Sequence, residues 1–288
     1  MRSRWYIESR LRYLPVFLAL ATSILVADTP QDLYRRTEYR AALNLLAPEA
    51  SKDPAVWHLA GKALFALGEF QKAQEWFEKA AQAEPKQSEH MHWLGKAFGR
   101  RAETSSFLTA PKYASECRKA FEKAVEIDPK NLEAWSDLLE YYLDAPGFLG
   151  GGLDKAATAA ARIGQLDAAE GHFAQARLAE KKEDWTAAEQ HWRAAAEAAP
   201  ASAGRWVDLA RFLAKRSRFD ESDRMFDKAL TVEPAAAPRV WFARAETNIE
   251  QKRNLTQARA WLDRYLAAQT TADDPSKDDA RRLLKKIS

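Results

Sequence analysis

One spacing of small and bulky residues constrains this chain most, because it recurs along almost the whole length. Its clearest copy lies in the stretch Trp57–Pro85, where Ala73, Phe77 and Ala80 are followed by a proline. Positions i, i+4 and i+7 lie on one helical face. A small residue there lets two helices approach closely, and the aromatic ring fills the space beside it. Proline cannot continue the helix, so Pro85 ends the unit.

The same spacing recurs in six further places, with varying completeness. The copies are Ala42–Leu46–Pro54, Cys117–Phe121–Ala124–Pro129, Ala156–Ala160–Ile163, Ala188–Trp192–Ala195–Pro200, Ser222–Phe226–Ala229–Pro234 and Ala258–Leu262–Tyr265. Trp57, Trp135 and Trp206 mark the first helix of their units, and Gly61 and Gly95 lie where a larger side chain would hold the helices apart. The pattern predicts helix pairs that stack on one another, and the abundant alanine favours helix over strand.

This pattern resembles the tetratricopeptide repeat (TPR) family, whose 34-residue unit carries W…LG…Y…A…F…A…P. The matching segments are residues 55–85, 169–200 and 203–234, and, with insertions or losses, 88–129, 132–168 and 239–268. The resemblance implies an all-α fold, a right-handed α-solenoid of antiparallel helix pairs (the TPR superhelix) with a C-terminal capping helix. About six full repeats and an N-terminal half repeat are expected over residues 28–268.

Two hairpins are longer than the repeat allows. Gly95 and Cys117 are 22 residues apart, whereas Gly61 and Ala73 are 12 apart. The extra residues, around Arg101–Pro111, are expected to bulge from the solenoid.

The second long hairpin is Ala145–Gly152, in which Phe148 and Leu149 precede three glycines. Gly150, Gly151 and Gly152 permit positive φ and close backbone approach. Two interpretations stay open: a flexible turn, or a ligand-contacting loop anchored by Phe148.

The two ends of the chain differ from the repeats. Residues 1–27 place a basic stretch before an apolar run and a small residue at Ala27, the order of a secretory signal peptide. A cleaved signal predicts a periplasmic or secreted protein, and an uncleaved one an inner-membrane anchor facing the periplasm. Residues 269–288 are expected to form a linker and a capping helix over 277–287, opened by a capping box of Ser276 and Asp279.

Charge and motifs exclude several function classes. The formal net charge of +3 comes from residues 1–27, so the mature chain carries no global basic field for nucleic acid. The single cysteine, Cys117, excludes a disulfide within the chain, and it is expected to be buried. No catalytic motif, metal site or cofactor site is recognised, so we expect no enzyme and no cofactor.

The TPR resemblance also implies a binding surface. In this family the first helices line the concave face, and residues one and five after the tryptophan position often face the ligand. The candidate groove residues are His58, Lys62, His92, Lys96, Arg100, Glu140, Arg177, Lys181, Arg211 and Lys215. Basic residues prevail, which suits a protein or peptide with an acidic segment. The asparagines of carboxylate-clamp TPRs are absent, so that specificity does not carry over.

Three functions fit these observations. The first is a non-catalytic scaffold in the cell envelope that holds a protein or peptide in its concave groove. The second is a small-ligand or glycan-binding periplasmic protein that uses the Phe148 loop. The third is a membrane-anchored subunit of an envelope assembly complex, for which residues 1–27 stay attached. The oligomeric state does not follow from the sequence.

Overall fold

A computed structural model of the chain describes residues 28–271 and 274–287. The expected signal peptide, residues 1–27, lies outside the described residues. The described residues form α-helices and two short 3-10 helices, with no strand among them. The elements are α1 (Pro30–Arg35), α2 (Tyr39–Leu46), α3 (Pro54–Ala66), α4 (Phe70–Ala83), α5 (Ser88–Thr104), α6 (Ala110–Ile127), α7 (Leu132–Asp144), η1 (Gly147–Leu149), α8 (Leu153–Leu166), α9 (Ala168–Lys181), α10 (Trp185–Ala198), α11 (Ala203–Lys215), α12 (Phe219–Val232), η2 (Pro234–Ala236), α13 (Ala237–Glu250), α14 (Leu255–Ala267) and α15 (Lys277–Lys286).

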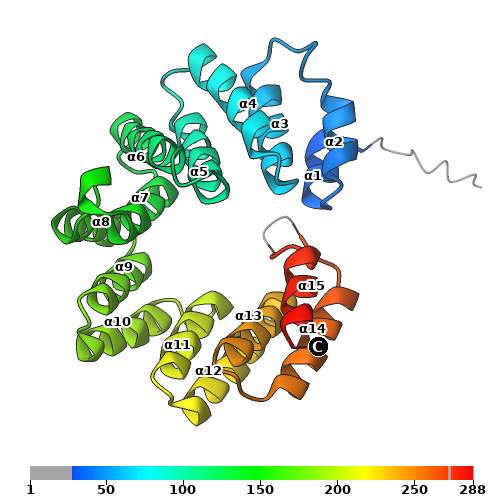
Figure 1. Cartoon of the computed structure of the whole chain (residues 1–288). Coiled ribbons are helices and arrows are strands. Elements are labelled where there is room, and N and C mark those ends of the chain that lie inside the picture. Colours follow the sequence, from blue (N-terminus) through cyan, green and yellow to red (C-terminus); the bar gives the residue numbers. More distant parts are fainter. Residues whose placement is uncertain (1–27, 272–273, 288) are drawn as a thin grey trace, which may run out of the picture.

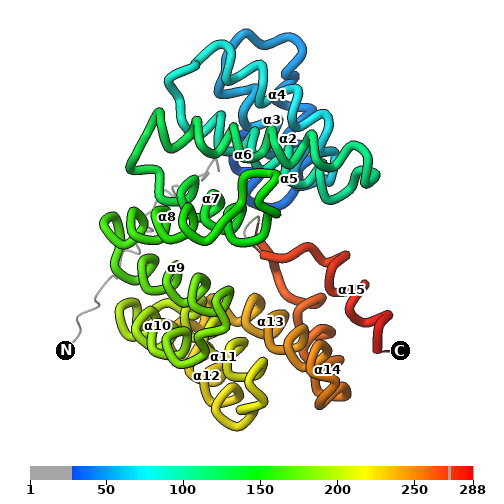
Figure 2. Tube along the Cα trace, turned by 60° about the vertical axis from the view of Figure 1, so that its left-hand side comes forward, coloured from blue at the N-terminus to red at the C-terminus, as the bar shows by residue number. Residues whose placement is uncertain are grey.

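Consecutive helices pack in pairs, from α1 with α2 to α13 with α14, and each pair packs on the next. The pairs follow a curved path that returns α15 toward the side of α1 (Figure 1). The odd-numbered helices form the inner layer of this ring and the even-numbered helices the outer layer. Figure 2 shows the same path from a second direction, with the N-terminal pairs above the C-terminal ones. The predicted fold class, an α-solenoid of helix pairs, is confirmed.

The recurring small and bulky residues form the contact between the two layers. Ala73, Phe77 and Ala80 of α4 are all fully buried, as are the equivalent residues of α10, α12 and α14 to within a few per cent. A Cβ on Gly61 would lie 2.6 Å from the ring of Phe77, and one on Gly95 would lie 2.5 Å from the ring of Phe121. The absence of a side chain at these two positions therefore sets the distance between the paired helices.

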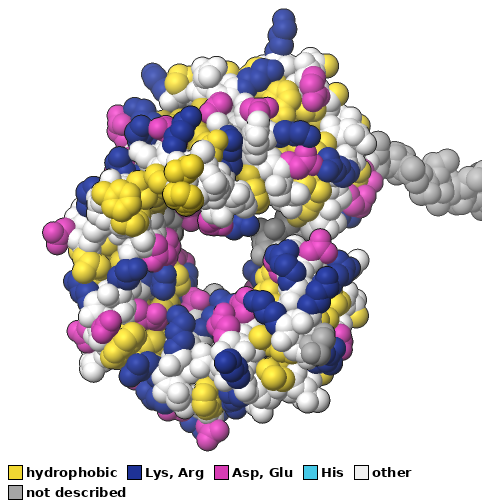
Figure 3. All heavy atoms as spheres, in the orientation of Figure 1, with side chains coloured by type: hydrophobic (Ala, Val, Ile, Leu, Met, Phe, Trp, Pro, Cys, Tyr) yellow, Lys and Arg dark blue, Asp and Glu magenta, His cyan; other side chains and the backbone are white. Residues whose placement is uncertain are grey.

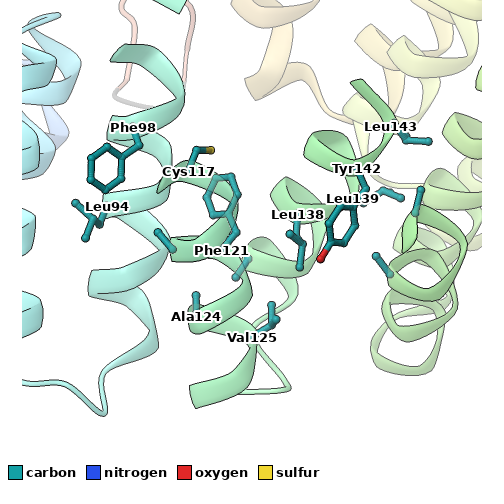
Figure 4. Packing of buried hydrophobic residues seen from close by; sticks show 14 of the residues in the cluster. Leu94, Phe98, Cys117, Phe121, Ala124, Val125, Leu138, Leu139, Tyr142 and Leu143 are labelled. Carbon is teal, nitrogen blue, oxygen red and sulfur yellow. The ribbon is translucent and has the colours of Figure 1, made fainter. Parts of the chain in front are cut away.

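A continuous core joins neighbouring repeats. Leu94 and Phe98 of α5 pack on Cys117 and Phe121 of α6, and this group continues through Leu138 to α8 (Figure 4). Burial raises the pKa of the Cys117 thiol to about 12. Cys117 is thus an unreactive core residue, as expected from its place in the repeat.

The two long hairpins have different structures. The extra residues after Gly95 lengthen both helices, since α5 has 17 residues and α6 has 18, whereas α3 and α4 have 13 and 14. Only residues 105–109 separate α5 from α6, so the expected bulge is a pair of longer helices that extends beyond its neighbours.

The hairpin after α7 forms the 3-10 helix η1 and then the glycine run. Gly150 has φ +90° and Gly152 has φ +152°, so two of the three glycines take backbone angles that other residues rarely adopt. Tyr141 Oη donates a hydrogen bond to the Leu149 carbonyl at 2.9 Å, and Lys155 Nζ donates one to the Gly150 carbonyl at 2.9 Å. These bonds hold the loop to its own repeat.

Both ends of the array have their own elements. The N-terminal unit, expected as a half repeat, consists of the short helices α1 and α2. At the other end α15 begins at the predicted capping box of Ser276 and Asp279 and packs Leu283 on the last repeat. Such a cap covers apolar surface that the final repeat would otherwise expose.

Within residues 28–271 and 274–287, no helix has both the length and the apolar character needed to span a bilayer.

Candidate binding surface

The inner helices present a charged wall to the central opening of the ring. Lysines and arginines alternate with aspartates and glutamates around this opening (Figure 3). Nine of the ten candidate groove residues keep some solvent exposure on the odd-numbered helices α3, α5, α7, α9 and α11. His92 is the exception, because it is fully buried. The wall has two parts, α3 with α5 and the inner helices from α7 onwards, which differ in how their charged side chains are paired.

From α7 onwards, cations of the wall meet acids of a neighbouring inner helix. Glu140 of α7 accepts two hydrogen bonds from Arg177 of α9, at 2.9 and 2.5 Å. Three further ion pairs follow: Asp144–Lys181 at 3.2 Å, Glu180–Lys215 at 3.5 Å and Glu246–Arg211 at 2.7 Å. We call these four ion pairs the ladder. Half-exposed pairs of this kind stabilise a fold by less than about 1 kcal/mol each. Their main consequence is that the basic row is neutralised on this half of the wall.

On α3 and α5 the balance is different. The ammonium groups of Lys62 and Lys96 lie 4.6 and 4.3 Å from the ring of Trp93. Neither lysine forms an ion pair with another described residue, and Lys62 also lies 5.6 Å from the Tyr34 ring. We call Lys62, Trp93 and Lys96 the Trp93 cluster. It places two positive charges beside one indole ring, and neither has an ion-pair partner among the described residues. Glu89 contacts the ring itself, since its carboxylate accepts a hydrogen bond from Trp93 Nε1 at 2.8 Å.

Arg100 continues from this cluster along α5. It pairs with Glu103 of the same helix and lies 5.0 Å from the ring of Phe70. Its charge is therefore balanced within α5, unlike the charges of Lys62 and Lys96.

Two candidate groove residues, His58 and His92, form contacts between neighbouring inner helices. His58 Nδ1 lies 2.9 Å from His90 Nδ1, and the His58 ring packs on Phe77 and Trp93. His92 Nε2 lies 2.7 Å from Asp137 Oδ2, on the next inner helix. Both rings thus join neighbouring helices. Only His58 keeps part of its surface exposed.

The Phe148 loop lies outside the wall. The Phe148 side chain is 82% exposed, whereas Gly150 is packed so closely that a Cβ there would lie 2.7 Å from Arg118 Nε. Gly151 is tighter still, because its Cβ would lie 1.8 Å from the carbonyl oxygen of Ala145. Two of the glycines therefore allow the loop to lie against α6 and α7, while Phe148 points to solvent.

Comparison with known proteins identifies the repeat. Residues 54–87 match the sequence model of the tetratricopeptide repeat. A tetratricopeptide repeat protein from Parabacteroides merdae has a similar structure, with a TM-score of 0.57 over 89% of this chain and 93% of that one, at 13% identity. Residues 54–87 form a tetratricopeptide repeat, and the array as a whole has the fold of tetratricopeptide repeat proteins.

Two further solved structures match most of the chain with lower TM-scores. The C-terminal part of a TPR-containing protein from Cytophaga hutchinsonii has a TM-score of 0.47 at 14% identity, over 88% of this chain and 98% of that one. A TPR protein from Thermus thermophilus has a TM-score of 0.45 at 19% identity, over 82% of this chain and 99% of that one. No curated protein matches the sequence.

The sequence interpretation missed two features of this wall. Trp93 was not among the predicted groove residues, although it lies three residues before Lys96 and so on the same helical face. The acids of the ladder were not paired with their cations, since the two members of a pair such as Glu140 and Arg177 are 37 residues apart. Only the first of these features has a local signal in the sequence.

His58 should make this protein less stable in acid. Its pKa is lowered to about 3, first by burial and then by His90, Lys62 and His92. Between about pH 6.5 and 3 the unfolded chain therefore holds a proton that the folded chain does not, so stability falls as the pH falls. The slope is at most about 1.4 kcal/mol per pH unit.

Urea unfolding from pH 7.5 to 4.5 measures this effect. We expect His58→Gln to lose part of the acid-induced decrease in stability while changing little near pH 8. Identical pH slopes for the two proteins would show that His58 does not titrate in this way.

Proposed function

We propose that this TPR protein is a non-catalytic scaffold of the cell envelope that binds an acidic segment of a partner protein on its concave wall. The Trp93 cluster is the observation that carries the proposal. Its two ammonium groups face an aromatic ring and have no ion-pair partner among the described residues. The candidate groove cations of α9 and α11 are all paired. A carboxylate of the partner supplies the missing negative charge.

The shape of the array supports a peptide as ligand. The inner helices form one curved surface that passes the cluster and continues along the ladder (Figure 1). An extended segment on this surface places its acidic residues at α3 and α5 and uncharged polar residues along the neutralised half. We infer that the acidic residues of the segment fix its position on the wall. A uniformly acidic ligand binds less well along the whole wall, because the ladder offers it no unpaired positive charge and its carboxylates repel the ligand.

Reversing the charge of the cluster tests the proposal. Lys62→Glu combined with Lys96→Glu should weaken binding of a fluorescein-labelled peptide rich in Asp and Glu by about tenfold or more, because two attractions become repulsions. Fluorescence anisotropy measures the affinity, and far-UV circular dichroism checks that helix content is retained. A glutamine-rich peptide of equal length measures binding that does not depend on charge.

A matched control carries the same charge change elsewhere. Lys86 and Lys130 lie in the turns that precede α5 and α7, are exposed, and form no ion pair with another described residue. Lys86→Glu combined with Lys130→Glu should reduce affinity only slightly. Equal losses in the two double variants would indicate a general charge effect and contradict a site at the Trp93 cluster.

The envelope location rests on residues 1–27, which the structure does not describe. N-terminal sequencing of the protein from its own cells tests the location, and a start near Asp28 supports export with cleavage. Retention of residues 1–27 would instead favour the membrane-anchored form of the scaffold.

A further inference from the structure

The exposed apolar side chains of this protein are concentrated at one edge of the solenoid. Among the described residues, Phe107, Leu108 and Phe148 are the most exposed large hydrophobic side chains, at 83%, 75% and 82%. We call these three residues the hairpin patch. Large apolar side chains that face water lower the solubility of a protein. A group of three on one surface therefore indicates a site that binds another molecule or a membrane.

The three residues come from adjacent repeats and lie at the same edge. Phe107 and Leu108 lie between α5 and α6, and Phe148 lies in η1 between α7 and α8. Because the first helices of successive repeats run in the same direction, the turns that follow them lie along one edge of the array. A Cβ on Gly150 would lie 2.7 Å from Arg118 Nε, so the loop beside η1 lies against α6, the helix that follows Phe107 and Leu108. Hydrophobic side chains gather where α6, α7 and α8 meet in the space-filling view (Figure 3).

The hairpin that carries Phe107 and Leu108 is also the most prominent one. Helices α5 and α6 are several residues longer than the helices of the first full repeat, α3 and α4. Apolar tips on an extended hairpin reach a broad surface before the rest of the molecule does. This geometry differs from a groove, which would enclose a peptide.

The charges beside the patch favour an anionic surface. Arg101, Lys112 and Lys155 have no acidic partner among the described residues, since Arg101 bonds to Gln74 and Tyr113, and Lys155 bonds to a carbonyl. Three other cations near the patch pair with acids: Arg100 with Glu103, Arg118 with Glu122 and Lys119 with Glu116. Among residues 100–119 and 144–158, Asp154 is the one acid without a described cationic partner, which leaves two positive charges uncompensated.

We propose that the hairpin patch docks this edge of the solenoid onto an anionic lipid bilayer. Phe107, Leu108 and Phe148 insert among the headgroups and acyl-chain ends, and Arg101, Lys112 and Lys155 attract the lipid phosphates. The sequence interpretation allowed a membrane contact only through residues 1–27. This contact is separate from them and from the Trp93 cluster, so it does not depend on the proposed peptide binding.

Vesicle flotation tests the proposal. The chain should begin at Asp28, because the apolar residues 13–26 would themselves bind lipid. This chain keeps every described buried contact, since the core begins at Leu33. It should float with phosphatidylcholine vesicles that contain about 30 mol% phosphatidylglycerol, and much less with phosphatidylcholine alone.

Substitutions then separate the two parts of the contact. Phe107→Ser, Leu108→Ser and Phe148→Ser together should weaken binding to the anionic vesicles by about tenfold or more, since three apolar side chains no longer insert. Lys112→Glu with Lys155→Glu should weaken binding to anionic vesicles only. The matched control is Leu45→Ser, which removes an exposed leucine from α2, away from both hairpins, and should leave binding unchanged.

Two results would overturn the proposal. One is a wild-type chain that does not float with anionic vesicles, or a triple serine variant that floats equally well. The other is a concentration-dependent dimer in sedimentation that the serine variant abolishes, which would assign the hairpin patch to a second copy of this chain.

Discussion

Replacing Phe77 with alanine should lower the free energy of unfolding by about 3–5 kcal/mol. The Phe77 side chain is fully buried and fills the space that Gly61 leaves between α3 and α4. It also contacts the rings of His58 and Trp93, so it joins the first full repeat to the second. The surrounding helices are held by their own contacts and cannot close the cavity, so the loss includes a cavity term.

Urea unfolding measures the effect, and Phe107→Ala is its matched control. Both variants remove the same atoms, but Phe107 is 83% exposed and its loss should change stability by less than about 0.5 kcal/mol. Similar losses in the two variants would contradict the assignment of Phe77 to the core.

A coupled pair of substitutions tests the contact itself. Gly61→Ala should destabilise the fold, because the new Cβ would lie 2.6 Å from the Phe77 ring. Phe77→Leu should relieve part of that overlap, so the double variant should lose less stability than the sum of the two single variants.

Replacing Gly171 with alanine should cost about 2–3 kcal/mol, although the same change usually favours a helix. Gly171 of α9 lies against the backbone of Gly164 in α8, where an added Cβ would be 2.4 Å from the Gly164 Cα. A side-chain neighbour could rotate away, but a backbone neighbour requires the two helices to separate. We therefore expect a lower midpoint in urea and a weaker junction between the third and fourth full repeats.

Gly164→Ala is the control, because the contact is not symmetrical. A Cβ on Gly164 would lie 3.6 Å from the Gly171 Cα, an ordinary van der Waals distance. This variant should be unchanged or slightly more stable, by up to about 1 kcal/mol. Hydrogen exchange at α8 and α9 would report the difference locally, and equal behaviour of the two variants would contradict the observed packing.

The repeat pattern predicted the architecture because the contacts of a solenoid are mostly local. Each helix packs on the next helix in the sequence, so the i, i+4, i+7 spacing of Ala73, Phe77 and Ala80 contains most of the information that pairs α3 with α4. A local pattern also predicted the capping box at Ser276. The candidate wall residues came from the TPR resemblance, and one of them, His92, is buried. The sequence interpretation placed the extra residues after Gly95 in a bulge, but in the structure they lengthen α5 and α6. The reason is that helix boundaries depend on contacts beyond the local pattern.

The sequence by itself therefore determined a stack of helix pairs, the layer to which each helix belongs and the wall that faces the central opening. Only the tertiary structure decided which charges of that wall remain uncompensated. Glu140 meets Arg177 across 37 residues, whereas Lys62 and Lys96 meet Trp93 and no described acid. These pairings depend on the angle between successive repeats, which sets the distance between side chains of different inner helices. Because no local pattern encodes that angle, the Trp93 cluster emerged only from the folded chain.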